Sequence, residues 1–366
     1  MVYLFKLIRA NLLWASSMRS KGPLYMVVWR CTRTCTYSCS YCSFASPPYV
    51  SGEISTEGGM RIVDEIYDFG ACWFGISGGE PLLRKDLFEI IGHAREIGLD
   101  VSLITNGDLV EDKIFDNLVR NEVHTAISID GTEEANDALR GKGAYAKAVS
   151  AMQKLSKEGM LDCLVTTLTN VNYKDVGHVV YLAEKYGARM SVFHNFIPVG
   201  RAKEHLELVP SPEQYEWVWN ELYDLMQKYK DKPRVNVYCP FFARVAKERG
   251  MPDFEDWFEN IFLGRCFFAG RYMGIIENGE VRRCGFNEGY RLGNIRDKTL
   301  KEFWGELQTS EFSLELRDRS NLKGKCGVCE YREICGGCRT RAKIYTGDIF
   351  GSDPACGYIP KILREK

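Results

Sequence analysis

Fourteen cysteines are the residues of this 366-residue chain that are best suited to chemistry, and most of them fall in two blocks. In the first block, Cys35, Cys39 and Cys42 stand close enough in sequence to hold one metal centre. Three thiolates can bind three irons of a cubane 4Fe–4S cluster and leave the fourth iron open, whereas electron-transfer clusters take four cysteines. Structural zinc, the alternative metal, also prefers four ligands. We expect Cys31 to lie still within a strand and not to supply a fourth thiolate.

The second block holds seven cysteines, three more than one cluster needs, and therefore implies two further clusters. Its members are Cys266, Cys284, Cys326, Cys329, Cys335, Cys338 and Cys356. Two zinc ribbons are the alternative, whereas disulfide frameworks belong mainly to small secreted domains. The sequence around these cysteines is rich in glycine and cysteine and poor in apolar residues for a core. It therefore predicts a small domain that bound metal must stabilise.

The elements that must position these cysteines alternate between short β-rich runs and helical patterns. Six strands are expected, at 25–31, 73–77, 101–105, 125–129, 164–169 and 191–197. Helices are expected at 59–67, 87–97, 146–157 and 176–186, and then at 212–230 and 240–249. Each return to a parallel neighbour needs a crossover, so this order predicts a parallel sheet. Functional residues of such sheets gather at the carboxyl ends of the strands.

Polar motifs follow three of the expected strands. They are Ser77-Gly78-Gly79-Glu80-Pro81 after the second strand, Thr105-Asn106-Gly107 after the third, and Ser128-Ile129-Asp130-Gly131 with Arg140 after the fourth. Paired glycines let the backbone come close to a neighbour, and proline stiffens the turn. Together with the three-cysteine loop, these motifs predict one binding site at the carboxyl end of the sheet.

The C-x3-C-x2-C spacing, with aromatic Tyr41 before the last cysteine, resembles the signature of the radical S-adenosylmethionine superfamily. The resemblance implies a partial (β/α)6 TIM-like barrel whose open iron binds S-adenosylmethionine. An electron from the cluster would cleave the sulfonium to give a 5′-deoxyadenosyl radical, which abstracts hydrogen from an unactivated carbon. Cofactor contacts are implied for Tyr41, Gly78, Gly79, Glu80, Pro81, Thr105, Asn106, Ser128, Asp130 and Arg140. The glycine turn would receive the methionine amino group, and Arg140 would pair with the carboxylate.

The second block resembles the SPASM extension of these enzymes, which holds two auxiliary 4Fe–4S clusters, although C-x2-C here replaces the usual C-x3-C. By that resemblance an outer cluster would have the ligands Cys326, Cys329, Cys335 and Cys356, and an inner cluster Cys266, Cys284 and Cys338. The inner cluster would be open on one iron, or capped by Cys239 or a non-cysteine group. The implied organisation is an N-terminal segment 1–22, a radical barrel 23–210, a helical linker 211–260 and a SPASM domain 261–366.

The last forty residues resemble the branch that modifies tetrapyrroles. The segments that carry this similarity are Cys335–Ala342, Tyr345–Asp348, Asp353–Cys356 and Phe196–Arg201. The resemblance implies that hydrogen is abstracted from a haem-type propionate, after which loss of carbon dioxide and one electron leaves a vinyl group. Arg201, Arg339 or Arg341 could hold the propionates.

Three rival functions stay open. One is a maturase that crosslinks a ribosomal peptide, although residues 1–22 are too few for a leader-recognition domain. Another is carbon–carbon bond formation on an isoprenoid lipid. The third is a non-catalytic iron–sulfur electron carrier or zinc scaffold, which would have no use for the S-adenosylmethionine motifs.

The overall composition is that of an ordinary enzyme. A net charge of −1 gives no indication of a nucleic-acid partner. Lys6 and Arg9 interrupt the apolar start of the chain, which favours a basic amphipathic helix over a secretory signal. That helix would pack on the following domain or contact a membrane surface or an apolar substrate. We therefore expect a cytoplasmic protein, possible peripheral membrane contact, and a reducing partner such as ferredoxin or flavodoxin.

Overall fold

The computed structural model describes residues 26–48, 51–70, 74–230, 232–255, 258, 266, 272–286 and 289–364. Within these ranges one sheet has the strand order β10-β9-β8-β1-β2-β3-β4-β5-β6-β7. The strands are β1 (Met26–Thr32), β2 (Phe74–Gly78), β3 (Val101–Thr105), β4 (His124–Ser128), β5 (Leu161–Thr167), β6 (Met190–His194), β7 (Arg234–Tyr238), β8 (Tyr272–Ile275), β9 (Glu280–Arg282) and β10 (Arg291–Asn294). All neighbours from β1 to β7 are parallel.

The six expected strands are present as β1 to β6, and the expected α/β partial barrel is confirmed. The sixth strand ends at His194, three residues earlier than expected. The chain leaves the sheet there, because the backbone N–H of Phe196 donates to the hydroxyl of Tyr215 on α8 (Pro212–Tyr229) and not to a neighbouring strand.

The segment 211–260 is not purely a helical linker. Its expected helices are α8 and α9 (Pro240–Glu248), but β7 lies between them and extends the parallel sheet beyond β6. The alternating sequence of β7 explains the strand, since Val235 and Val237 are buried while their neighbours are half-buried. Sequence reasoning missed this strand because five residues are a short signal between two strong helical patterns.

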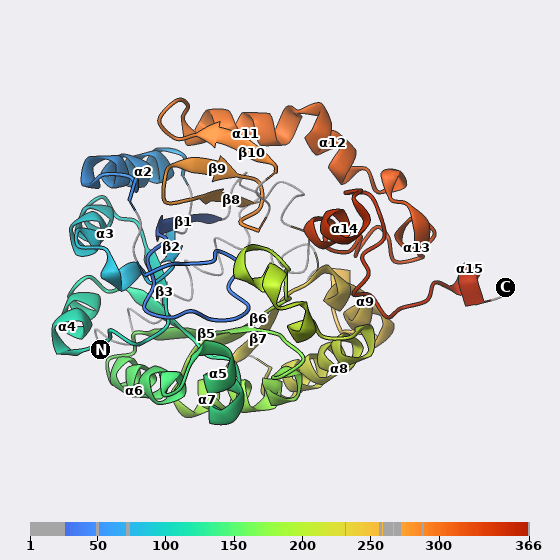
Figure 1. Cartoon of the computed structure of the whole chain (residues 1–366), viewed down its shortest axis with the longest axis horizontal. Helices are drawn as coiled ribbons and strands as arrows, with labels where there is room; N and C mark the ends of the chain where they lie inside the picture. The colour runs from blue at the N-terminus through green and yellow to red at the C-terminus, as the bar shows by residue number, and fades with distance from the viewer. Residues whose placement is uncertain are drawn as a thin grey trace.

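Helices cover the outside of the sheet, as Figure 1 shows. From β1 onward they are α2 (Thr56–Asp68), α3 (Leu87–Glu96), α4 (Asp112–Arg120), α5 (Glu133–Arg140), α6 (Ala144–Lys157), α7 (Val176–Lys185) and then α8 and α9. Short 3-10 helices interrupt the connections at η1 (Pro81–Leu83), η2 (Tyr173–Asp175), η3 (Gly200–Glu204) and η4 (Leu206–Leu208). Local sequence fixes the helix ends; α8, for example, begins with a capping box between Ser211 and Gln214.

The cysteine-rich end of the chain shares this sheet. β8 pairs parallel with β1, and β9 and β10 follow antiparallel. The remaining helices are α11 (Leu300–Thr309), α12 (Glu311–Arg317), η6 (Arg319–Asn321), α13 (Gly324–Gly327), α14 (Arg339–Thr346) and α15 (Lys361–Arg364), drawn in orange and red in Figure 1. Phe303 and Leu307 of α11 belong to the same buried cluster as Trp29 of β1. The two parts are therefore joined by sheet hydrogen bonds and by a common core.

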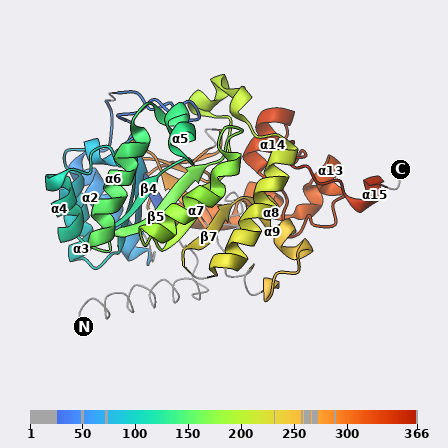
Figure 2. The same cartoon turned by 90° about the horizontal axis from the view of Figure 1, so that it is seen from below.

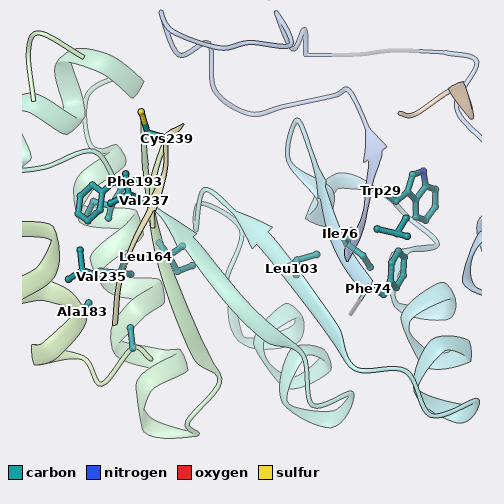
Figure 3. Close-up of a cluster of buried hydrophobic side chains, with 14 of the residues drawn as sticks. Trp29, Phe74, Ile76, Leu103, Leu164, Ala183, Phe193, Val235, Val237 and Cys239 are labelled. Carbon is teal, nitrogen blue, oxygen red and sulfur yellow. The ribbon is translucent and has the colours of Figure 1, made fainter. Parts of the chain in front are cut away.

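The two faces of the parallel strands differ in burial. The outer face packs on the helices, and Figure 3 shows labelled members of this core from Trp29 to Cys239. On β3, Val101, Leu103 and Thr105 are buried, whereas Ser102 and Ile104 on the opposite face are half-buried. β7 repeats this alternation. We call the half-buried face the inner face; on it, Ala126, Cys163 and Val192 of the strands between β3 and β7 form a small buried cluster.

Across the ranges described above, the chain forms no helix whose length and apolar character would allow it to cross a bilayer. The basic amphipathic helix expected at the start of the sequence lies outside the described residues.

Candidate functional site

The first cysteine block lies in the loop that follows β1. Figure 2 shows this loop in dark blue at one edge of the sheet, on the same side as α5 and the yellow-green η3–η4 segment. The carboxyl ends of the parallel strands meet at that edge. The sequence motifs expected to act together are thus brought to one end of the sheet.

The paired glycines after β2 hold the cysteine loop against the sheet. The backbone N–H of Gly79 donates to Thr32 O at 2.8 Å, and that of Glu80 donates to Thr34 O at 2.8 Å. A Cβ atom on Gly79 would lie 2.2 Å from Thr34 O, and one on Gly78 would lie 2.5 Å from Thr32 O. Only glycine permits this approach of two backbones.

Glu80 connects the glycine turn to the end of β3. Its buried carboxylate accepts hydrogen bonds from Thr105 Oγ1 at 2.7 Å, from the Asn106 backbone at 2.8 Å and from the Leu82 backbone at 3.1 Å. Burial raises the pKa of Glu80 to about 7, although these donors oppose the shift. The side chain of Asn106 in turn donates to Thr36 in the cysteine loop at 3.0 Å. Glu80 therefore acts here through its neighbours, as a residue that fixes the turn.

A second buried carboxylate, Asp130 after β4, joins two of the expected cofactor residues. It accepts a hydrogen bond from the hydroxyl of Tyr41 and another from Arg140 Nε, the latter at 2.6 Å. It also accepts from the backbone of Thr167 at 2.9 Å, which ties it to β5. Burial opposes the charge of Arg140, but Asp130 and Tyr41 together raise its pKa above the ordinary value. Ser128, at the end of β4, is half-buried on the inner face.

The thiols of the three-cysteine loop lie close enough to influence one another's ionisation. Burial raises the pKa of Cys35, and Cys42 contributes to the rise. Burial likewise raises the pKa of Cys39 to about 11, with contributions from Cys42 and Cys35. Such thiols gain by binding a metal, because coordination removes the proton outright. Among the residues that the structure describes, this loop brings together three thiols, which fit a cluster with one open iron.

Arg201 has a different position from the one expected of a propionate ligand. Its guanidinium donates to Cys39 O at 2.9 Å and to Ser46 O at 3.0 Å, and its backbone N–H donates to Cys42 O at 2.9 Å. A Cβ atom on Gly200 would lie 2.4 Å from the backbone of Ser43. The η3 segment therefore holds the later part of the cysteine loop, whereas the glycine turn holds its beginning, and we assign Arg201 that positioning role.

The four cysteines expected to hold the outer cluster line one pocket. The cavity wall includes Cys326, Cys329, Cys335 and Cys356 together with Arg244 and Lys325. Burial raises the pKa of Cys335 well above its ordinary value, and Cys356 and Cys326 add to the rise. Four thiols around one cavity fit a fully ligated cubane cluster.

The three cysteines expected to hold the inner cluster also converge. Burial raises the pKa of Cys284 to about 12, with Cys338 and Cys266 contributing. The hydroxyl of Thr340 lies 3.7 Å from the sulfur of Cys284. Cys239, expected as a possible cap, is buried, and its thiol interacts electrostatically with Arg341 and with Cys335 of the outer set.

Arg339 and Arg341, expected as substrate ligands, are both about 1% exposed and bind the protein itself. Arg341 forms a two-pronged ion pair with Asp353 at 2.7 and 2.8 Å. Arg339 donates to Ile349 O and Gly351 O, each at 2.8 Å. Asp353 also accepts from the Cys338 backbone at 2.7 Å. The guanidinium of Arg341 is therefore fully bonded to the protein, whereas Nε and Nη2 of the enclosed Arg339 have no hydrogen-bond partner among the described residues. Both arginines stabilise the loops that carry the second cysteine block.

The described residues contain no group of three Cys, His, Asp or Glu side chains arranged for a single metal ion. A cubane cluster places each cysteine on a separate iron and so holds its ligands farther apart than zinc does.

Sequence reasoning missed two hydroxyls beside the expected ligands. Ser46 lies 3.9 Å from the sulfur of Cys42, and Thr340 lies near Cys284 as described above. Ser46 follows Cys42 by four residues and Thr340 follows Cys338 by two, so proximity to a cysteine was the available signal.

Comparison with known proteins agrees with this geometry. Residues 29–184 match the radical SAM superfamily, and residues 266–339 match an iron–sulfur cluster-binding domain, SPASM. An AdoMet-dependent heme synthase of Methanosarcina barkeri is 32% identical over 92% of this chain and 97% of its own length. The Fe-coproporphyrin III synthase of the same organism is 28% identical over 93% of this chain and 90% of its own length.

Two further proteins share the architecture. The mycofactocin maturase MftC of Mycolicibacterium smegmatis is 31% identical over 90% of this chain and 82% of its own length. The structure of Streptococcus suis SuiB bound to the precursor peptide SuiA has a TM-score of 0.73 at 15% identity, covering 96% of this chain and 80% of that one. At that identity the likeness concerns the fold alone. Thiol geometry, glycine turn and whole-length similarity together show that the chain belongs to the radical SAM superfamily and is one of its enzymes with a SPASM domain.

Proposed function

We propose that this radical SAM enzyme modifies the propionate side chains of an iron tetrapyrrole. The observation that carries the proposal is the similarity to the M. barkeri heme synthase, which extends over 97% of that protein and includes both parts of this chain. The Fe-coproporphyrin III synthase supports it at nearly the same coverage. The half-buried inner face of the sheet is consistent with a large ligand beside the cysteine loop.

The chain would hold three 4Fe–4S clusters in this proposal. The first would be bound by Cys35, Cys39 and Cys42, and S-adenosylmethionine would lie against the glycine turn, Asn106, Ser128 and Arg140. The other two would be bound by the inner and outer cysteine sets. When bound, these groups supply a hydrogen-abstracting 5′-deoxyadenosyl radical and an acceptor for one electron.

The residues of the chain contribute positioning and exclusion of water. Glu80 and Arg201 fix the cysteine loop from two sides, and Asp130 holds Tyr41 and Arg140. A propionate that loses one hydrogen atom, carbon dioxide and one electron becomes a vinyl group. Holding the reacting carbon in place is worth several orders of magnitude in rate, about 10⁵ M or more in effective concentration.

The test is incubation of anaerobically reconstituted protein with Fe-coproporphyrin III, S-adenosylmethionine and dithionite. We expect about twelve irons per chain, release of 5′-deoxyadenosine, and a tetrapyrrole product lighter by carbon dioxide and hydrogen. A Cys35/Cys39/Cys42 triple alanine variant is the control and should release no 5′-deoxyadenosine. Colourless protein that holds zinc, or a tetrapyrrole recovered unchanged, would contradict the proposal.

A peptide maturase is the second candidate, because the MftC similarity is 31% over 90% of the chain. The same protein incubated with short candidate precursor peptides in place of the tetrapyrrole separates the two functions. Change in peptide mass without change in the tetrapyrrole would favour the maturase. In either case we propose ferredoxin or flavodoxin as the natural reductant, which should replace dithionite in both reactions.

A further inference from the structure

His194 ends β6 at the same edge of the sheet as the cysteine loop. It pairs in register with Thr167, whose backbone N–H donates to Asp130 at 2.9 Å. It therefore stands two strands away from the Asp130 cluster that holds Tyr41 and Arg140, or roughly 10 Å at the usual strand spacing. The histidine is thus near the cofactor residues but is separated from them.

The side chain of His194 belongs to the inner face of the sheet. Its ring stacks on that of Tyr238 at the end of β7, with 4.4 Å between ring centroids and 16° between planes. Tyr238 itself packs against the inner-face cluster formed by Ala126, Cys163 and Val192. His194 is half-buried, as are Asn236 and Tyr238 on β7, whereas Val192 on the same face of β6 is buried. Part of the His194 side chain is therefore accessible from the inner face.

Within the described part of the chain, His194 is the one histidine whose ring has no polar or charged partner. The other four are His93 with Asp64, His124 beside Asp162, His178 with Tyr145 and His205 with Glu207. Burial lowers the pKa of His194 to about 4, so the imidazole is neutral near pH 7 and keeps a free lone pair. A neutral imidazole without a polar partner has the form in which histidine binds metals.

We propose that His194 binds the iron of an iron-tetrapyrrole substrate as an axial ligand. This inference rests on the proposed function and deepens it, because it distinguishes an iron tetrapyrrole from its metal-free form. Imidazole is a common axial ligand of haem iron. The iron lies at the centre of the macrocycle and the propionates lie at its rim, so an iron ligand must stand back from the cofactor residues, as His194 does.

Tyr238 would contribute to this site by holding the imidazole plane. The stacked ring restricts rotation of His194 about its side-chain bonds, and the hydrogen bond from the Leu168 backbone N–H to His194 O at 2.9 Å fixes its main chain. A ligand that is ordered before binding loses less conformational entropy when the substrate arrives.

The test is a spectroscopic titration of the reconstituted holoenzyme with ferric Fe-coproporphyrin III and, separately, with metal-free coproporphyrin III. The wild-type protein should convert the iron tetrapyrrole to a histidine-ligated spectrum. His194→Ala should lose that spectrum and bind the iron form at least about tenfold more weakly, which is 1.4 kcal/mol. It should bind the metal-free form like the wild type, and added imidazole should restore the histidine-ligated spectrum. His194→Met should give a third spectrum, because a thioether also binds iron. His93→Ala, a partly exposed histidine on α3, is the matched control and should behave as the wild type.

Two results would overturn the inference alone. One is an unchanged iron spectrum in His194→Ala; the other is an equal loss of affinity for the iron and metal-free forms, which would indicate a stacking or structural role. If the wild-type protein binds neither tetrapyrrole, the proposed function fails, and this inference fails with it. Iron content of the clusters, measured in every variant, separates these results from misfolding.

Discussion

Gly79→Ala should separate the cysteine loop from the sheet. The new Cβ would lie 2.2 Å from Thr34 O and 2.6 Å from Arg33 O. Both are backbone atoms, so no flexible side chain can yield. To reach ordinary contact at 3.4 Å, Thr34 O must retreat by about 1.2 Å. That movement would stretch the 2.8 Å hydrogen bond from the Glu80 backbone beyond bonding distance.

The consequence should appear in catalysis more than in stability. One lost hydrogen bond costs about 1 kcal/mol net, which a chain of this size tolerates. A displacement of about 1 Å between a reactive group and its partner costs about 100-fold in rate. We therefore expect reductive release of 5′-deoxyadenosine from S-adenosylmethionine to fall about 100-fold, while the auxiliary cysteine sets keep their iron.

Gly177→Ala is the matched control, because Gly177 lies in α7 with no atom within 4 Å of the new Cβ. Alanine in a helix interior is favoured over glycine by about 1 kcal/mol, so this variant should be active and at least as stable. The assay measures 5′-deoxyadenosine by chromatography, with iron content and circular dichroism taken on the same samples. If Gly79→Ala releases 5′-deoxyadenosine at the wild-type rate, the close approach of the two backbones does not position the cluster loop.

Three further changes test the buried polar groups. Burial raises the pKa of Glu80 from 4.5 to about 7, so between these pH values the folded protein holds a proton that the unfolded chain has released. Its contribution to the free energy of unfolding is therefore present at low pH and lost as pH rises to about 7; Glu80→Gln should remove this slope from urea titrations made across that range. Thr340→Val removes the hydroxyl 3.7 Å from the Cys284 sulfur, and we expect the reduction potential of the inner cluster to fall in an electron paramagnetic resonance titration, whereas Thr340→Ser should keep it. Arg341→Met leaves Asp353 buried without its ion-pair partner and should cost about 3–5 kcal/mol in urea unfolding; the double change Arg341→Met with Asp353→Leu should recover much of that loss, and no recovery would contradict the ion-pair explanation.

The sequence alone was sufficient for the elements that depend on local pattern. Six β-rich runs separated by amphipathic segments determined a parallel sheet, because parallel neighbours require crossovers. The spacing of Cys35, Cys39 and Cys42 indicated an open iron, and the paired glycines after β2 indicated a close approach of two backbones. The parallel sheet and the close approach at the glycines are present in the structure. Local residue types signalled both, although the residues that they contact lie tens of positions away.

Partners distant in sequence account for most of what could not be foreseen. β7 is a short strand whose place depends on pairing with β6, so its five residues carried too weak a signal. Arg201 lies about 160 positions from the carbonyls of Cys39 and Ser46 that it holds. Nothing in the local sequence distinguishes such a guanidinium from one that awaits an anionic substrate.

Arg341 and His194 show the same division. From the sequence, Arg341 is a positively charged residue near cysteines that could hold a propionate. Only the fold showed that it is buried and paired with Asp353. The sequence did not single out His194. The environment of its imidazole depends on its place on the inner face of the sheet and on the ring of Tyr238, which comes from another strand. Residue type and spacing thus determined which cofactor chemistry this chain can support. Burial and long-range pairing decided that Arg201 and Arg341 serve the protein itself, and they leave the neutral imidazole of His194 without a polar partner among the described residues.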